Sequence, residues 1–142
     1  MLKRLFFIAA LAMVYAATAH AQYDMSRPFK ATIYNKEYDV YMRLNLYDND
    51  VVIGWQEMLG ELPGFLAKSG NNYCWLITEA TVDGKKAELE MVNDSGSDDL
   101  NATLTFEGDS VYTLRRKSGA VIKVPNSGKW QKLPSTLIFK HR

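Results

Sequence analysis

The sequence predicts an all-β fold, a single antiparallel meander of eight to ten short strands. Apolar and polar residues alternate with the period of a half-buried strand, and turn residues recur every ~8–12 positions. Beyond the first 21 residues, no stretch of about ten residues has the helical period. Closing a meander into a barrel removes the exposed strand edges that invite aggregation, so we expect a barrel. An open β-sandwich is the alternative.

The first half of the predicted barrel begins with a strand over 29–34 and continues with a hairpin over 39–56. Within that hairpin, apolar residues alternate with polar ones over 39–47, and Asp48-Asn49-Asp50 forms the expected turn. The next segment, 58–68, is ambiguous because it contains two glycines and a proline. It fits a strand with a bulge or a loop with one helical turn, but not a regular helix.

The second half repeats the same alternation. Asp83-Gly84 is a hairpin turn signal, and Pro134 keeps the segment 130–135 out of any central strand. We expect 130–135, including Trp130, to be a loop. The expected strands cover 73–79, 87–91, 100–106, 110–116, 120–124 and 136–140.

The N-terminus has the organisation of a cleavable signal peptide over 1–21. Lys3 and Arg4 form a positive region, an apolar run covers 5–14, and Ala19-His20-Ala21 is a small-x-small cleavage site. The apolar run is shorter than the ~20 residues of a membrane span. A buried N-terminal helix is the alternative. We therefore expect an exported protein, periplasmic or extracellular, whose mature chain begins at Gln22.

The predicted mature chain, 22–142, has the length of one domain. The full sequence contains 17 Lys and Arg against 16 Asp and Glu. Loss of Lys3 and Arg4 leaves 15 against 16, a formal net charge of −1. That balance gives no electrostatic case for nucleic acid or for an anionic membrane surface. No other stretch is apolar enough to span a bilayer, so no membrane span is expected.

The residue inventory argues against most catalysis. Cys74 is the only cysteine, expected as a buried apolar side chain, with a reactive thiol or an intermolecular bridge as alternatives. His141, next to the C-terminus and expected to fray, is the only histidine left after cleavage. Nucleophilic triads and zinc sites need more such residues than this. We expect no enzyme, no cofactor and no metal.

Acidic residues leave one catalytic alternative, a hydrolase built on two carboxylates. Most of the candidate glutamates, named below, alternate with apolar residues, which places them on a solvated face. The acidic loop 94–99 departs from the calcium-loop pattern. We interpret the acidic segment 48–50 as a turn, with a metal site as the alternative. The candidate carboxylates are Glu57, Glu61, Glu79, Glu88 and Glu90.

About half of the chain resembles small exported bacterial proteins with a lipocalin-like β-barrel. The resemblance implies a barrel and a binding role. Gly128-Lys129-Trp130 has the form of the lipocalin G-x-W triplet, but it stands before the last strand instead of in the first. For that reason no lipocalin ligand site is transferred to this chain. The residues that carry the resemblance are 75–77, 83–87, 98–102 and 128–134.

Aromatic residues are the most suggestive candidates for a binding site. Tyr41 and Tyr47 fall on the polar face of their strand, and exposed aromatic side chains bind sugars, peptides and proteins. Neighbouring residues on a strand face opposite sides, so Arg115 and Arg116 cannot both point outward from a barrel wall. One of them is a candidate for the interior or the mouth of the barrel, and a strand end already in water is the alternative. Ordinary packing in the barrel core is the alternative for Trp55 and Trp75. The candidate ligand-binding residues are Trp55, Tyr73, Trp75, Arg115 and Trp130.

These observations predict an exported, non-enzymatic protein that binds a small apolar or amphipathic ligand in or at the mouth of a β-barrel. A protein-interaction module or inhibitor of the cell envelope is the first alternative. The partner is then an envelope protein that recognises an aromatic patch around Tyr41, Tyr47 or Trp130.

Overall fold

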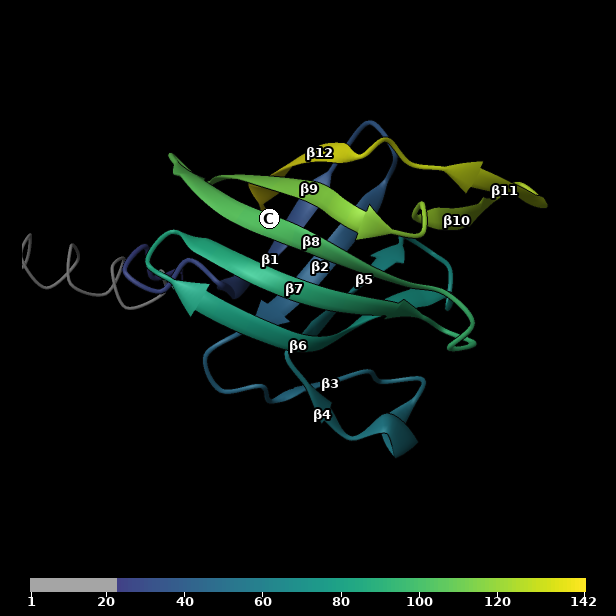
Figure 1. Cartoon of the computed structure of the whole chain (residues 1–142), viewed down its shortest axis with the longest axis horizontal. Coiled ribbons are helices and arrows are strands. Elements are labelled where there is room, and N and C mark those ends of the chain that lie inside the picture. Colours follow the sequence, from purple (N-terminus) through teal and green to yellow (C-terminus); the bar gives the residue numbers. More distant parts are fainter. Residues whose placement is uncertain (1–22) are drawn as a thin grey trace, which may run out of the picture.

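A computed structural model describes residues 23–142, which form a closed antiparallel barrel of eight strands (Figure 1). The predicted barrel is therefore confirmed, and the sandwich alternative is wrong. The predicted signal peptide, 1–21, lies outside the described residues. Going round the barrel, the strands are β1 (Lys30–Asn35), β12 (Thr136–His141), β9 (Val111–Gly119), β8 (Asp99–Gly108), β7 (Lys86–Asn93), β6 (Cys74–Asp83), β5 (Gly64–Lys68) and β2 (Val40–Asn45).

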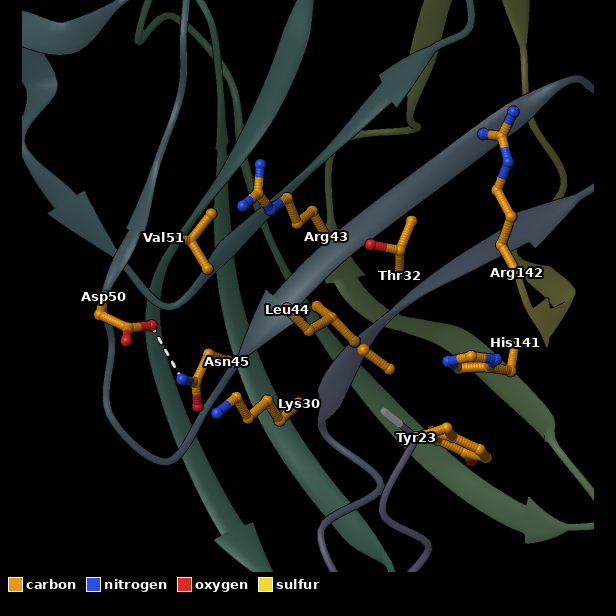
Figure 2. A pocket seen from close by; sticks show the side chains of 11 residues that line it. Tyr23, Lys30, Thr32, Arg43, Leu44, Asn45, Asp50, Val51, His141 and Arg142 are labelled. Carbon is orange, nitrogen blue, oxygen red and sulfur yellow. Dashed lines mark hydrogen bonds between the residues drawn. The ribbon is translucent and has the colours of Figure 1, made fainter. Parts of the chain in front are cut away.

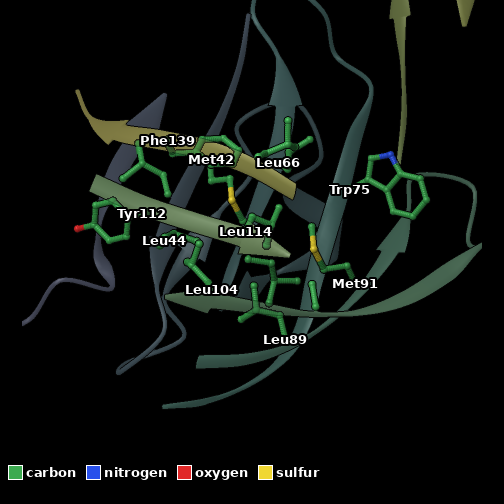
Figure 3. Packing of buried hydrophobic residues seen from close by; sticks show 14 of the residues in the cluster. Met42, Leu44, Leu66, Trp75, Leu89, Met91, Leu104, Tyr112, Leu114 and Phe139 are labelled. Carbon is green, nitrogen blue, oxygen red and sulfur yellow. The ribbon is translucent and has the colours of Figure 1, made fainter. Parts of the chain in front are cut away.

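Strand alternation fills the barrel interior with apolar side chains (Figure 3). Each of the eight strands contributes at least one side chain that is no more than 2% exposed. Burial of this much apolar surface is the main stabilising term of the fold. The fully buried interior residues include Ile33, Met42, Leu66, Ile77, Leu89, Leu104, Tyr112, Leu114 and Phe139.

Aromatic side chains close the end of the barrel where the described chain begins and ends. The Tyr112 hydroxyl donates to the Pro28 carbonyl at 2.5 Å and lies 2.8 Å from the Tyr23 hydroxyl. His141 does not fray as expected. It pairs with Ile33 of β1 and stacks on Tyr23 with ring centroids 3.8 Å apart, because the last strand closes the barrel.

From the opposite end, called here the hairpin end, a small hairpin of β10 (Lys123–Asn126) and β11 (Lys129–Lys132) projects beyond β9 and β12 (Figure 1). Val124 of β10 is fully buried in the barrel core, and the Trp75 indole N–H donates to the Lys123 carbonyl at 3.0 Å. Trp130 therefore lies on a strand and not in the expected loop. The prediction was wrong because β11 has only four residues, too few to show a strand period, and Pro134 follows closely.

A second insertion, Val51–Leu62, called here the arm, corrects the predicted hairpin over 39–56. It consists of β3 (Val51–Val52), the 3-10 turn Glu57–Leu59 and β4 (Glu61–Leu62). β3 pairs with β4, whereas β2 pairs with β1 and β5. Within residues 23–142, no helix has the length and apolar character of a membrane span.

The arm is held in place because β5 is apolar on both faces. Leu66 points into the barrel, while Phe65 and Ala67 form a second, outer core with the arm's Val51 and Ile53. A strand buried on both faces loses the alternation that predicts a half-buried one. The part of the ambiguous segment that forms β5 therefore shows no strand period in sequence, in addition to the glycines and proline of 58–68.

Gly64 gives the first testable prediction, because a Cβ there would be driven into the Arg43 carbonyl oxygen across the β2–β5 ladder. We expect Gly64→Ala to lower the free energy of unfolding by about 1–3 kcal/mol through overpacking. Urea unfolding followed by circular dichroism measures this. Gly54→Ala is the matched control, since nothing lies within 4 Å of its added Cβ. Equal stability of the two variants would contradict the packing described.

Cys74 gives the second prediction. It is buried in the outer core beneath the arm, and burial, with Asp94 nearby, raises the pKa of the thiol to about 11. Relative to a free cysteine with a pKa of ~8.5, the thiolate fraction at pH 8 falls about a hundredfold or more. We expect negligible labelling by a disulfide reagent in the native protein and rapid labelling in guanidinium. Native labelling as fast as that of the unfolded chain would refute the buried placement.

Candidate functional site

The fold brings three of the predicted ligand-binding residues together at the hairpin end. Trp75 lies inside the barrel mouth and is 1% exposed, beneath the backbone of β10. Tyr73, in the loop before β6, meets Trp130 edge to face with ring centroids 4.9 Å apart. Trp130 remains 60% exposed. One buried and two more accessible aromatic rings therefore mark this end of the molecule.

The other two predicted residues lie elsewhere. Trp55 is on the arm, 38% exposed, with its ring edge to face against Phe65 at 5.6 Å. Arg115 is exposed on the outer wall, paired across the sheet with Thr103 and Thr136. By alternation, Arg116 is the arginine on the inward side, and its guanidinium donates to the Gly119 carbonyl at 3.0 Å.

The aromatic patch expected around Tyr41 and Tyr47 is largely covered. Tyr41 packs against the outer core beneath the arm, and Tyr47 packs against Phe29 and accepts its backbone N–H at 3.1 Å. Of the three aromatic residues expected in a protein-binding patch, Tyr41, Tyr47 and Trp130, only Trp130 is well exposed. Exposed apolar side chains gather on the arm instead: Val52, Trp55, Met58 and Leu59.

The barrel seam between β1 and β12 leaves a groove at the hairpin end. These strands pair at only two positions, Ile33 with His141 and Tyr34 with Lys140, and then diverge. Beyond that point the Asn35 side-chain amide donates to the Ile138 carbonyl at 2.9 Å, where a neighbouring strand's backbone would otherwise bond. The resulting hollow, called here the seam groove, has a volume of about 610 Å³. That size is typical of small-molecule sites.

The seam groove combines apolar contacts with a cationic rim. Its apolar lining comes from the β1–β2 turn on one side and from the start of β12 on the other: Tyr34, Tyr38, Pro134, Leu137 and Ile138. Ile138 is 50% exposed and so accessible to a ligand, whereas Leu137 is only 2% exposed. Lys36, Lys140 and Arg142 stand on the rim with Glu37, and the Asp39 carboxylate is bonded to Tyr34 behind one wall, so three cations face two carboxylates.

A hydrogen-bonded pair steadies one wall of the groove. The Tyr34 hydroxyl donates to the Asp39 carboxylate at 2.5 Å, and the Arg142 guanidinium lies over the Tyr34 ring, 4.9 Å from its centroid. The bond from Tyr34 holds the pKa of Asp39 below its usual value, and the same bond raises the pKa of Tyr34. Asp39 therefore stays ionised and Tyr34 stays protonated near neutral pH, which fixes this wall.

A larger groove, of about 730 Å³, lies on the outer face of β1 and β2 toward the other end of the barrel (Figure 2). Lys30, Arg43 and Arg142 line it, together with Asp50. Figure 2 shows the three cationic side chains extending in different directions, with Lys30 toward Asn45. Since their charges do not converge, this groove offers no single point to hold a ligand's anionic group.

The candidate carboxylates divide between two places. Glu57 and Glu61 belong to the arm, while Glu79, Glu88 and Glu90 meet in a shallow hollow on the outer wall. The charge of Glu79 raises the pKa of Glu90, and the bond from Lys117 lowers that of Glu88. All three are exposed to water, which screens such pairs strongly. Among residues 23–142, no group of three or more potential ligands is arranged to hold a metal ion.

Sequence reasoning missed the seam groove itself. Nothing local in the sequence marks Ile138 or Lys140 as lining a site, because the groove exists only where the first and last barrel strands separate. Knowledge of which strands close the barrel was needed. Comparison of the chain with known proteins finds no matching protein family, no matching curated protein and no matching solved structure.

Proposed function

We propose that the protein is an exported, non-enzymatic binding protein that takes a small amphipathic ligand in the seam groove. The observation that carries this proposal is the divergence of β1 and β12, which leaves a groove with an apolar lining where a continuous barrel wall would otherwise stand. The interior of the barrel is filled by its own side chains, so the ligand lies at the edge of the mouth. This placement agrees with a binding role at a barrel mouth.

The lining of the groove selects the ligand's chemistry. An alkyl or ring system lies on Ile138, Pro134 and Tyr38, where each buried CH₂ contributes about 0.8 kcal/mol. Lys140 and Lys36 on the rim receive an anionic head group that stays close to water. The proposed ligand is therefore a single-chain or small-ring carboxylate and not a neutral oil.

Calorimetry with three twelve-carbon ligands tests the proposal: dodecanoate, dodecyl maltoside and dodecyltrimethylammonium, each kept below its micelle concentration. We expect dodecanoate to bind most tightly and the cation most weakly, because the rim is positive. Ile138→Glu places a carboxylate on the apolar lining, and we expect at least a tenfold loss of dodecanoate affinity. Lys140→Glu should reduce the preference for dodecanoate over dodecyl maltoside.

The matched control is Val52→Glu on the arm, since Val52 is 41% exposed and Ile138 50%. It introduces the same charge on a similarly exposed apolar side chain outside the seam groove. We expect it to leave dodecanoate affinity within twofold. If Ile138→Glu binds dodecanoate as well as the unaltered protein does, the groove is not the site. If no ligand binds, the proposed function is wrong.

A further inference from the structure

Charge is divided unevenly along the chain although its total is nearly balanced. From Ser110 to the C-terminus there are eight lysines and arginines and no aspartate or glutamate. All 16 acidic residues of the sequence therefore lie before this segment. Because β9, β10, β11 and β12 all come from it, one sector of the molecule is basic. The net charge of the chain conceals this separation.

The β10–β11 hairpin carries the most exposed part of the basic sector. Its pairing places Lys123 opposite Lys132 and Pro125 opposite Trp130. These four residues share the outer face, since Val124, on the other face, is fully buried. Paired residues are about 5 Å apart across the strands, and the two pairs are about 7 Å apart along them. We call this face the hairpin platform.

Within residues 23–142, the lysines of the hairpin platform form no ion pair. The ion pairs among residues 23–142 are Arg27 with Asp48 and Lys117 with Glu88, and neither involves the hairpin. The Trp130 ring packs edge to face against Tyr73, which fixes its orientation, and Trp130 remains 60% exposed. A fixed, accessible indole beside two ammonium groups suits a ligand that has both a flat apolar face and a negative charge.

We propose that the hairpin platform binds an acidic polysaccharide. A pyranose ring lies on the exposed Trp130 indole, and carboxylate or sulfate groups on neighbouring sugar units meet Lys123 and Lys132. The side chains of Asn126 and Gln131 bond to each other at 3.2 Å on the opposite face of the hairpin and link its two strands behind the indole. This site is distinct from the seam groove and does not depend on the function proposed for it.

Two other polyanions fit the surroundings less well. A flat anionic bilayer pressed on this end would also meet the acidic loop between β7 and β8. Burial raises the pKa of Tyr73, and the nearby charges of Asp94 and Asp98 in this loop raise it further. A narrow polymer can follow the hairpin and avoid that loop. Single-stranded nucleic acid is bound by rows of aromatic side chains on which successive bases stack, and the platform offers one indole.

Binding of polygalacturonate, heparin, polyglutamate and an oligothymidylate to the purified protein, measured by calorimetry in 50 mM salt, tests this proposal. Polygalacturonate and polyglutamate each carry one carboxylate per unit, but only the first has sugar rings. We expect at least one of the two polysaccharides to bind at least tenfold more tightly than polyglutamate. Trp130→Ala should abolish that difference.

Charge is tested by the double variant Lys123→Glu and Lys132→Glu, with Lys85→Glu and Lys86→Glu at the other end of the barrel as the matched control. We expect at least a tenfold loss of polysaccharide affinity for the first and less than twofold for the second. Circular dichroism confirms that each variant is folded. Dodecanoate binding in the Trp130→Ala variant should stay within twofold, which separates this site from the seam groove.

Three results would overturn the proposal. Neither polysaccharide binding would show that the platform holds no such ligand. Equal affinity for polyglutamate, unaffected by Trp130→Ala, would reduce the interaction to non-specific charge. Tighter binding of the oligothymidylate, lost in Trp130→Ala, would identify a nucleic-acid site instead.

Discussion

Closure of the barrel between its first and last strands is the constraint on which the rest of the structure depends. The seven other ladders of the barrel follow the order of the chain, apart from the two inserted hairpins, but β1 and β12 must pair across more than one hundred residues. They pair at two positions only. The ring is therefore closed with a short ladder, a side-chain amide from Asn35 and aromatic packing around Tyr112. The seam groove is the direct consequence of that short ladder.

The two inserted hairpins solve different problems of burial. The arm covers the apolar outer face of β5 and β6, including Cys74, which an open barrel wall would expose. The β10–β11 hairpin packs against Trp75, whose indole N–H needs an acceptor once it is buried and finds the Lys123 carbonyl. Each hairpin in turn exposes a tryptophan, Trp55 on the arm and Trp130 on the platform. Each hairpin therefore buries an apolar part of the barrel and at the same time presents a new exposed aromatic side chain to solvent.

The barrel could be predicted because its strands alternate, and the main errors fall where alternation fails. β5 is buried on both faces, so its apolar run, Gly64–Ala67, carries no period, and the partner of β2 was assigned to the wrong segment. Tyr73, Trp75 and Trp130 were predicted as candidates one by one, but their convergence depends on where the β10–β11 hairpin folds. The seam groove could not be predicted, because it belongs to no single strand and arises where two distant strands separate.

Charge segregation adds a constraint that the net charge alone does not express. A basic sector over β9–β12 and acidic residues elsewhere give the molecule a dipole, so a polyanion approaches in a preferred orientation even when the total charge is close to zero. Both proposed sites lie in this sector, since Lys140 stands on the groove rim and Lys132 on the platform. An anionic ligand at either site lowers the local positive potential. The two sites are therefore expected to compete weakly through charge at low salt and to become independent as salt shortens the screening length.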